Sequence, residues 1–393
     1  MYLESISFIK KPINGSGWEI NNCNFNKVNL VAGQNASGKT RLLKAIDTLV
    51  NILLDNNKKV IAKFYFNWEI ILKEKDNVYI YRLEIKDTTV VYEKLLINNE
   101  EYFSRDISGK GQIKYESKKN LKLDFEIEKD KIAIESKRDK KQHPSLELIF
   151  NWINSVYMYN FGETLGRNTF IAPKTNIDED NISNEISKND KAVVFKFEKG
   201  LEKYKQKFKD DIIKDFNSIG YSIVDIDTTR NNELFKKLED SEFPIPSILH
   251  IKEKNIDDKI YQQEISQGMF RVLSLIIQIK YLEYELDEGT TILIDDIGEG
   301  LDFERANNLI KYLIKNIEQF KDKIQLIMTT NDRLVMNNVP LEHWIIVDKD
   351  DNGKINFYSE KTHPENFENF EDVGLNNFNF FSGEYYKNCA WDD

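Results

Sequence analysis

One stretch near the N-terminus constrains the fold more than any other. Residues 28–43 read Val-Asn-Leu-Val-Ala-Gly-Gln-Asn-Ala-Ser-Gly-Lys-Thr-Arg-Leu-Leu. The first five residues form an apolar run typical of a buried strand, and the last residues begin an amphipathic helix. Between them, Gly33 to Thr40 fit the pattern G-x-x-x-x-G-K-[ST]. A strand, a glycine-containing loop of this spacing and a helix together indicate a phosphate-binding loop.

The residue types in this loop suit phosphate chemistry. Gly33 and Gly38 allow the backbone to curl so that its N–H groups face phosphate oxygens, and the helix N-terminus favours negative charge. We expect Lys39 to reach the β- and γ-phosphates and the Thr40 hydroxyl to bind Mg²⁺. An ordinary glycine turn is the alternative. The predicted nucleotide-binding residues are Gly33, Gln34, Asn35, Ala36, Ser37, Gly38, Lys39, Thr40 and Arg41.

Charge limits the partners that we expect. The net charge of −11 over 393 residues opposes diffuse binding to nucleic acid, which requires clustered positive charge. Two lysine-rich segments are candidates for such a cluster, residues 137–141 and residues 196–209. In the second segment apolar residues recur at helical spacing, which favours a solvated helix face. DNA contact by either segment is the alternative.

The sequence also indicates the compartment. Apolar runs such as residues 272–279 are too short to span a membrane, and the N-terminus lacks the apolar core of a signal peptide. Cys23 and Cys389 lie far apart in the chain, and neither belongs to a C-x-x-C pair. The four histidines are scattered. We therefore expect a soluble cytoplasmic protein without a membrane partner, a disulfide scaffold or a zinc site.

Periodicity predicts an α/β chain. Alternating apolar residues between positions 60 and 134 predict an antiparallel β-meander, and polar residues 175–190 predict a mobile loop. The remaining predicted strands are 3–9, 18–30, 221–226, 291–296, 324–328 and 344–347, and the helices include 41–54, one starting at Pro144, 272–286 and 303–317. We divide the chain into a lobe with the loop and a β-rich arm (1–145), a helical insertion (146–255) and a second lobe (256–393).

The second lobe carries further polar motifs. Ser266-Gln267-Gly268 comes just before a strongly apolar helix. The predicted strand 291–296 ends in the carboxylates Asp295 and Asp296, where a ligand for Mg²⁺ is needed. The next strand ends in Thr-Thr-Asn-Asp, with Asn331 as its third residue. A plain helix N-cap is the alternative for the first motif, and a solvated strand end is the alternative for the carboxylates.

These motifs together resemble the ABC-type P-loop ATPases, and most closely the branch that contains SMC, RecF and OLD proteins. Bacterial members of this branch are often labelled AAA-type core domain ATP-binding proteins, and some act in phage defence. The resemblance covers about residues 1–55 and 260–350. It implies an ABC-type core, with a mixed sheet flanked by helices, to which the meander arm and the helical insertion are added.

The resemblance implies a role for each motif. Asp295 would hold Mg²⁺, Asp296 occupies the position of a water-orienting glutamate, and Asn331 occupies that of a histidine that contacts the γ-phosphate. Ser266 and Gly268 match a signature motif that caps ATP bound to a neighbouring subunit. Three departures indicate slow hydrolysis: Ile-Ser-Gln-Gly-Met instead of Leu-Ser-Gly-Gly-Gln, aspartate instead of glutamate, and asparagine instead of histidine.

Three functions follow from this resemblance. The first is a slow, Mg²⁺-dependent ATPase that acts as a dimerisation switch and controls a DNA transaction or a separate effector, such as a nuclease or toxin in phage defence. The second is a nucleotide-binding scaffold or sensor with weak catalysis. The third is a RecF-like DNA-repair protein, which the acidic charge disfavours. In the first, the partner of the chain is a second copy of itself.

Two other features favour structural roles. Residues 348–353 begin like a calcium loop, but position twelve is Ser359, so a hairpin with an Asn-Gly turn is the simpler interpretation. The C-terminal region is rich in aromatic residues, which either cover the core or dock a partner; we favour core cover. These aromatic residues are Phe378, Phe380, Phe381, Tyr385, Tyr386 and Trp391.

Overall fold

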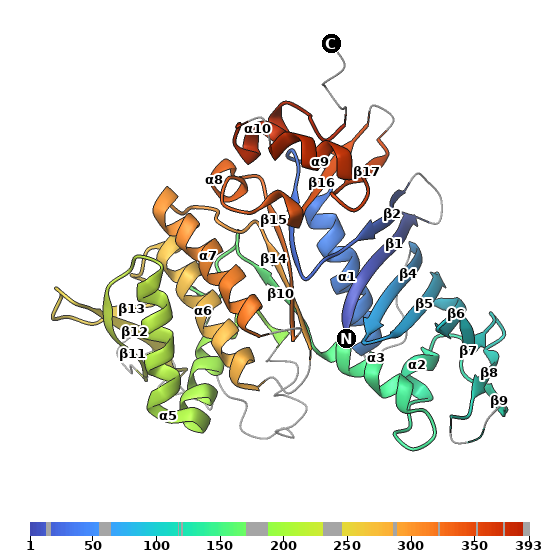
Figure 1. Cartoon of the computed structure of the whole chain (residues 1–393). Coiled ribbons are helices and arrows are strands. Elements are labelled where there is room, and N and C mark those ends of the chain that lie inside the picture. Colours follow the sequence, from blue (N-terminus) through green and yellow to red (C-terminus); the bar gives the residue numbers. More distant parts are fainter. Residues whose placement is uncertain are drawn as a thin grey trace, which may run out of the picture.

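The chain forms three β-sheets with helices packed between and around them (Figure 1). The computed structural model describes residues 1–12, 17–54, 64–116, 118, 121–169, 188–230, 246–285, 289–320, 323–350, 353–371 and 374–387. Residues 175–187 of the predicted polar loop, Cys389 and Trp391 lie outside these ranges. Among the described residues, no helix is both long enough and apolar enough to cross a membrane.

The central sheet has six strands in the order β10-β14-β15-β3-β16-β17. The first five are parallel to their neighbours, and β17 is antiparallel to β16. Every residue of β3, β14 and β15 is buried, as expected for parallel strands covered on both faces. The strands are β3 (Val28–Ala32), β10 (Val156–Asn160), β14 (Thr290–Asp295), β15 (Ile324–Thr330), β16 (Trp344–Lys349) and β17 (Ile355–Tyr358).

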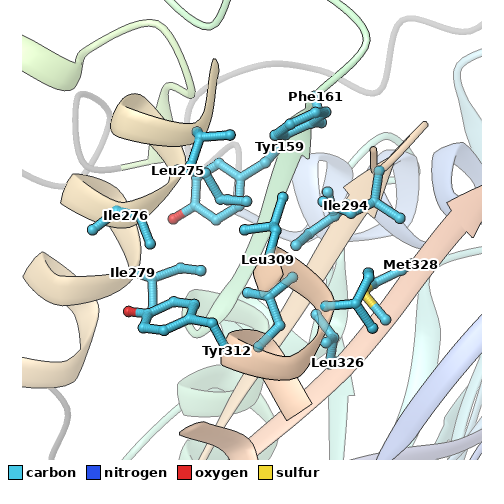
Figure 2. Packing of buried hydrophobic residues seen from close by; sticks show 14 of the residues in the cluster. Tyr159, Phe161, Leu275, Ile276, Ile279, Ile294, Leu309, Tyr312, Leu326 and Met328 are labelled. Carbon is cyan, nitrogen blue, oxygen red and sulfur yellow. The ribbon is translucent and has the colours of Figure 1, made fainter. Parts of the chain in front are cut away.

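Two long helices cover one face of this sheet, α6 (Gln267–Glu285) and α7 (Phe303–Gln319), and a third, α5 (Val193–Ser218), packs against α6. A kink at Lys205, where φ is 59°, divides α5 into two helical segments. Figure 2 shows how side chains from α6 and α7 meet those of the strands. The labelled residues are Tyr159, Phe161, Leu275, Ile276, Ile279, Ile294, Leu309, Tyr312, Leu326 and Met328.

The opposite face packs on α1 (Lys39–Leu54), which a second sheet covers in turn. The indole of Trp68 on β4 donates to the Ala45 carbonyl of α1 at 3.1 Å. This second sheet is antiparallel, with the order β2-β1-β4-β5-β6-β7-β8-β9. Its strands are β1 (Tyr2–Pro12), β2 (Trp18–Asn24), β4 (Phe64–Glu74), β5 (Asn77–Lys86), β6 (Thr89–Ile97), β7 (Glu100–Arg105), β8 (Lys110–Lys114) and β9 (Lys122–Glu126).

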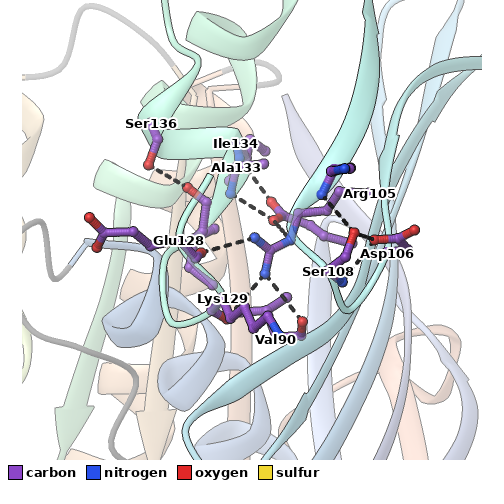
Figure 3. A network of polar contacts seen from close by, with 12 residues as sticks. Val90, Arg105, Asp106, Ser108, Glu128, Lys129, Ala133, Ile134 and Ser136 are labelled. Atoms are coloured by element: carbon purple, nitrogen blue, oxygen red, sulfur yellow. Dashed lines mark hydrogen bonds and ion pairs between the residues drawn. The ribbon is translucent and has the colours of Figure 1, made fainter. Parts of the chain in front are cut away.

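This sheet confirms the predicted meander. Residues of β4 and β5 alternate between buried and more exposed positions along most of each strand. Two helices, α2 (Ala133–Ser136) and α3 (Pro144–Asn154), link the arm to β10. Glu93 and Arg105 lie fully buried between the arm and α2, where they form the polar network of Figure 3. The arm is therefore tied to the core by polar as well as apolar contacts.

The remaining elements complete the two ends of the molecule. A third sheet contains β11 (Ile223–Thr229), β12 (Ile248–Glu253) and β13 (Ile260–Tyr261), and it packs beside α5. The C-terminal region contains α8 (Arg333–Met336), η2 (Leu341–His343), α9 (Pro364–Glu371) and α10 (Asn377–Ser382). Phe380 and Tyr386 are buried in the core cluster, so these tail aromatics cover the core as predicted.

Two predicted elements have different bounds in the structure. The run predicted as one strand from Trp18 to Leu30 forms β2 and β3, which belong to different sheets and are separated by residues 25–27. The Asn29 side chain closes this connection, because its Oδ1 accepts from the Asn26 N–H at 2.6 Å and its amide donates to the Asn26 carbonyl at 2.8 Å. The apolar helix begins at Gln267 rather than Val272, since the Ser266 carbonyl already accepts from the Phe270 N–H. The three proposed segments of the chain stay a prediction.

Candidate nucleotide-binding site

The glycine-containing loop follows β3 and leads directly into α1. Gly38 has φ +116°, a conformation that glycine adopts readily, and Ala36 also has a positive φ of 62°. A Cβ on Gly33 would lie 2.6 Å from both the Ser37 hydroxyl and the Val347 carbonyl. The loop therefore has no room for a side chain at Gly33. The Ser37 hydroxyl is buried and has no hydrogen-bond partner among the described residues.

Lys39 is buried at the start of α1, and its ammonium group folds back onto the loop. It donates to the carbonyl oxygens of Gly33 and Gln34, both at 2.9 Å. Burial lowers the pKa of Lys39, whereas the carboxylates of Asp296 and Asp295 act in the opposite direction. The lysine therefore lies between the loop and the carboxylate pair.

Asp295, the last residue of β14, joins three elements of the site. Its Oδ1 accepts from the Thr40 hydroxyl at 3.1 Å and from the Thr329 hydroxyl at 2.6 Å. Thr40 belongs to α1 and Thr329 to β15, and Asp295 itself is buried. The carboxyl ends of β3, β14 and β15 thus bring two hydroxyls and a carboxylate together. Oxygen ligands of this kind are those that Mg²⁺ prefers.

Asp296 follows the strand with a positive φ of 54°. Its N–H donates to the Thr329 hydroxyl at 2.9 Å. Burial raises the pKa of Asp296, the charges of Asp295 and Glu299 raise it further, and Lys39 opposes this shift. The two adjacent carboxylates consequently differ in their surroundings. Asp295 accepts hydrogen bonds from two hydroxyls, whereas Asp296 lies beside other acids.

Asn331 also lies at this edge of the sheet. Its side-chain amide donates to the Asn35 side-chain oxygen at 2.7 Å, which links the end of β15 to the glycine-containing loop. The structure therefore brings Asn331, Asp295 and Asp296 together with the loop, although about 260 residues separate the two parts of the sequence.

Ser266 and Gly268 lie in a different place. Together with Leu301 and Asp302 they line a surface hollow of about 460 Å³. A Cβ on Gly268 would lie 2.8 Å from the Gly300 carbonyl, so the start of α6 packs closely on the loop after β14. No hydrogen bond connects Ser266 or Gly268 to residues 33–41 in the described part of the chain.

Comparison with solved structures finds SMC heads. The crystal structure of an SMC head bound to the C-winged helix domain of ScpA superposes with a TM-score of 0.52 at 13% identity, covering 92% of this chain and 99% of that chain. The chain therefore has the fold of an SMC head, with an ABC-type P-loop core. RecF gives a TM-score of 0.41 at 16% identity, covering 91% of this chain and 98% of that chain.

Sequence comparison adds a distant relative of this chain. The ATP/GTP phosphatase of Helicobacter pylori (strain ATCC 700392 / 26695) is 24% identical over 331 residues, which are 79% of this chain and 80% of that protein. No protein-family model matches the chain.

The ABC-type fold also positions residues that sequence reasoning missed. Arg271 on α6 donates to three backbone carbonyls, those of Glu163 at 2.8 Å, Glu299 at 2.9 Å and Gly162 at 2.5 Å. A Cβ on Gly162 would lie 3.2 Å from the Cβ of Asp296. Arg271 therefore fixes two loops beside the carboxylate pair. No local pattern identifies it, because its partners are backbone atoms from distant segments.

A second missed residue is Asn160, the last residue of β10. It lies in register with Asp295 on the adjacent strand. Its side-chain amide donates to Asp190 at 2.9 Å. β10 was not predicted, because residues 156–160 directly follow the helix expected from Pro144, so no predicted strand end pointed to Asn160.

The geometry fits a nucleoside triphosphate with Mg²⁺. A Cβ would fill the curled loop at Gly33, the buried Ser37 hydroxyl lacks a partner among the described residues, and a cationic side chain lies beside both. The contact between Thr40 and Asp295 provides hydroxyl and carboxylate oxygens in one place. These are the donors and acceptors that the phosphates and the metal require.

Proposed function

We propose that this protein is a Mg²⁺-dependent ATPase that binds ATP at residues 33–41 and hydrolyses it slowly. One observation carries the proposal: the Thr40 hydroxyl, at the end of the phosphate-binding pattern, lies 3.1 Å from Asp295, the carboxylate that ends β14. The SMC-like fold and the name of the Helicobacter pylori relative, an ATP/GTP phosphatase, support the same chemistry.

The chain's own residues bind and orient the nucleotide in this proposal. The N–H groups of the loop and the Lys39 ammonium hold the phosphates, while Thr40 and Asp295 hold Mg²⁺. The bound metal offsets the negative charge of the phosphates. Asp296 accepts a hydrogen bond from the attacking water, and Asn331 orients the γ-phosphate end through its side-chain amide. Arg271 keeps the loops around Asp296 in position.

We further propose that ATP pairs two copies of the chain. The signature residues Ser266 and Gly268 line an open hollow and make no hydrogen bond to the chain's own loop in the described structure. A phosphate held by a second copy would face the N-terminal end of α6, where negative charge is favoured. In this proposal the paired chains control a separate effector, such as a nuclease or toxin in phage defence, or they act on DNA.

The first test removes the Lys39 ammonium group. Lys39→Ala should abolish measurable binding of Mg-ATP in calorimetry while the chain stays folded, because no other side chain places a positive charge on the two loop carbonyls in the described structure. Titration with Mg-GTP shows whether the base matters. Lys44→Ala, one turn further along α1, is the matched control and should bind normally. Unchanged ATP affinity in Lys39→Ala would overturn the proposal.

A nucleotide sensor with little turnover is the second candidate. Two observations favour it. A raised pKa disfavours the ionised form of Asp296, which is the form expected to accept a hydrogen bond from water, and the contact with Asn35 occupies the side-chain amide of Asn331. Phosphate release that is identical in wild type and Asp296→Asn, with intact ATP binding, would establish the sensor.

A further inference from the structure

The loop after β10, residues 161–168, connects two sites that lie apart in the molecule. Near its first end, the Gly162 N–H donates to the carbonyl of Asp295, the candidate Mg²⁺ ligand, at 3.4 Å. Near its other end, Arg167 contacts residues 262–265, which lead into the signature residues. One short loop therefore contacts both the nucleotide site and the backbone that presents the signature.

Arg167 is tied to this backbone by hydrogen bonds in both directions. Its Nε donates to the Ile265 carbonyl at 2.8 Å, and its Nη2 donates to the Gln263 carbonyl at 2.5 Å. The Arg167 carbonyl accepts in return from the side-chain amide of Gln262 at 3.1 Å. Gln262 is fully buried, and its Oε1 also accepts from the Leu249 N–H of β12 at 3.0 Å. Contacts from outside α6 therefore hold the backbone immediately before this helix.

These bonds fix the peptide unit that presents Ser266. Because a peptide unit is planar and trans, the Ile265 carbonyl and the Ser266 N–H point in opposite directions, and a donor on the carbonyl sets the direction of the N–H. A charged donor also polarises the peptide unit, which makes its N–H a stronger donor. Ile265 is buried, whereas Ser266 is exposed at the start of α6. Arg167 thus directs this N–H from below the surface.

We propose that Arg167 is a positioning residue for the phosphate that the second copy of the chain binds, and not for the phosphate of its own chain. The inference rests on the proposed pairing of two copies. The loop begins beside the nucleotide site of its own chain, but the guanidinium of Arg167 donates to the backbone before Ser266, which serves the partner's nucleotide in a pair. Arg167 does not touch the phosphate itself; it acts through the peptide between Ile265 and Ser266.

The first part of the test examines single variants of the full-length chain. Arg167→Ala should lower phosphate release about tenfold or more, because the signature peptide is misplaced. Its affinity for Mg-ATP in calorimetry should stay within about twofold of wild type, which also shows that the variant folds. Arg167→Lys keeps the charge but cannot hold two carbonyls with a planar fork, so it should give the same pattern with a smaller loss.

The matched control removes another arginine with defined contacts. Arg138 pairs with Glu147 and lies over the ring of Phe150, away from residues 161–168 in the sequence. Arg138→Ala should release phosphate as wild type does, so a loss of turnover that is confined to Arg167 variants is not a general effect of removing an arginine.

Mixtures then decide which nucleotide Arg167 serves. In a pair of Arg167→Ala with Lys39→Ala, one composite site has both defects, and the other has an intact loop and an intact signature. Phosphate release should rise well above that of either variant alone, to about a quarter of the wild-type rate, because about half of the pairs are mixed and each has one intact site. In a pair with Ser266→Arg, both composite sites have a defective signature, so release should not rise.

Other patterns would overturn the inference. Recovery with Ser266→Arg but not with Lys39→Ala would assign Arg167 to the nucleotide of its own chain. No recovery with either, in mixtures where differently tagged chains pair, would make Arg167 purely structural. The mixture of Lys39→Ala with Ser266→Arg is the reference. If the reference stays inactive, the proposed pairing fails and this inference fails with it, whereas an active reference beside an inactive mixture of Arg167→Ala with Lys39→Ala overturns this inference alone.

Discussion

Among single residues, the carboxylate pair after β14 shows how neighbouring acids acquire different chemistry. Asp295 accepts hydrogen bonds from two hydroxyls, whereas Asp296 lies close to Asp295 and Glu299 and has a raised pKa. A raised pKa in the folded chain means that ionised Asp296 is less favourable there than in the unfolded chain. Its contribution to stability is therefore present at low pH and is lost as pH rises through the folded pKa.

Asp296→Asn should consequently stabilise the chain at neutral pH, and the gain over wild type should shrink on acidification toward the ordinary pKa of aspartate. Phosphate release should fall, since the amide cannot accept the proton of the attacking water. In wild type, activity should decline on acidification at a higher pH than an unperturbed aspartate would give. Denaturant unfolding at both pH values measures the stability effect. Asp257→Asn, an exposed site, is the control and should give no such pH-dependent gain.

The phosphate-binding loop could be predicted because its residues are contiguous in the sequence. Other contacts of the site join residues that lie far apart in the sequence. The spacing from Gly33 to Thr40 lies within eight residues, and the ends of buried strands indicated Asp295 and Asp296. Arg271 acts through backbone carbonyls, which leave no side-chain pattern.

At the scale of elements, α6 acts through Arg271 on the loops that follow β10 and β14. One guanidinium reaches three carbonyls because its donors point in different directions, which an ammonium group cannot match. Alternating apolar residues predicted the meander because successive side chains of a strand point to opposite faces, and each of these strands has one buried face. The bounds of α6 were less predictable, because its first turn is fixed by contacts with the loop at Gly300.

Arg271→Lys tests this positioning role. It should lower phosphate release about tenfold or more through misplacement of Asp296, and leave ATP affinity within about twofold. Lost hydrogen bonds should also reduce the free energy of unfolding by about 2 kcal/mol. Steady-state kinetics and calorimetry separate the two effects, with Arg82→Lys in the arm as the control. A variant whose stability falls while its turnover is unchanged would make Arg271 purely structural.

The arm depends on its buried network in a similar way. Glu93 accepts from the N–H groups of Ala133 at 2.7 Å and Ile134 at 2.8 Å and from the Tyr81 hydroxyl at 3.0 Å. The Nε atom of Arg105 lies 3.6 Å from the Oε2 atom of Glu93, so the two side chains form an ion pair but no hydrogen bond through Nε. The other guanidinium nitrogens of Arg105 donate to the carbonyls of Val90, Glu128 and Lys129.

Glu93→Ala should therefore destabilise the chain by about 3–5 kcal/mol, because it leaves the buried Arg105 charge without its partner. Glu93→Gln keeps the shape and should cost less. Denaturant unfolding followed by tryptophan fluorescence measures both. Glu126→Ala, at an exposed position of β9, is the control and should be nearly neutral. Equal stability of Glu93→Ala and this control would show that the network contributes little.

For the whole molecule, the separation of the signature hollow from the phosphate-binding loop predicts that the active unit contains two chains. Lys39→Ala disables the loop, and Ser266→Arg fills the hollow with a bulky side chain, so each variant alone should be inactive. In a mixture, a pair of different chains has one composite site with both defects and one with none. Phosphate release should therefore reappear on mixing, and Ser108→Arg in the arm should behave as wild type. Differently tagged chains show whether mixed pairs form. Mixed pairs that release no phosphate would count against a site shared between two chains.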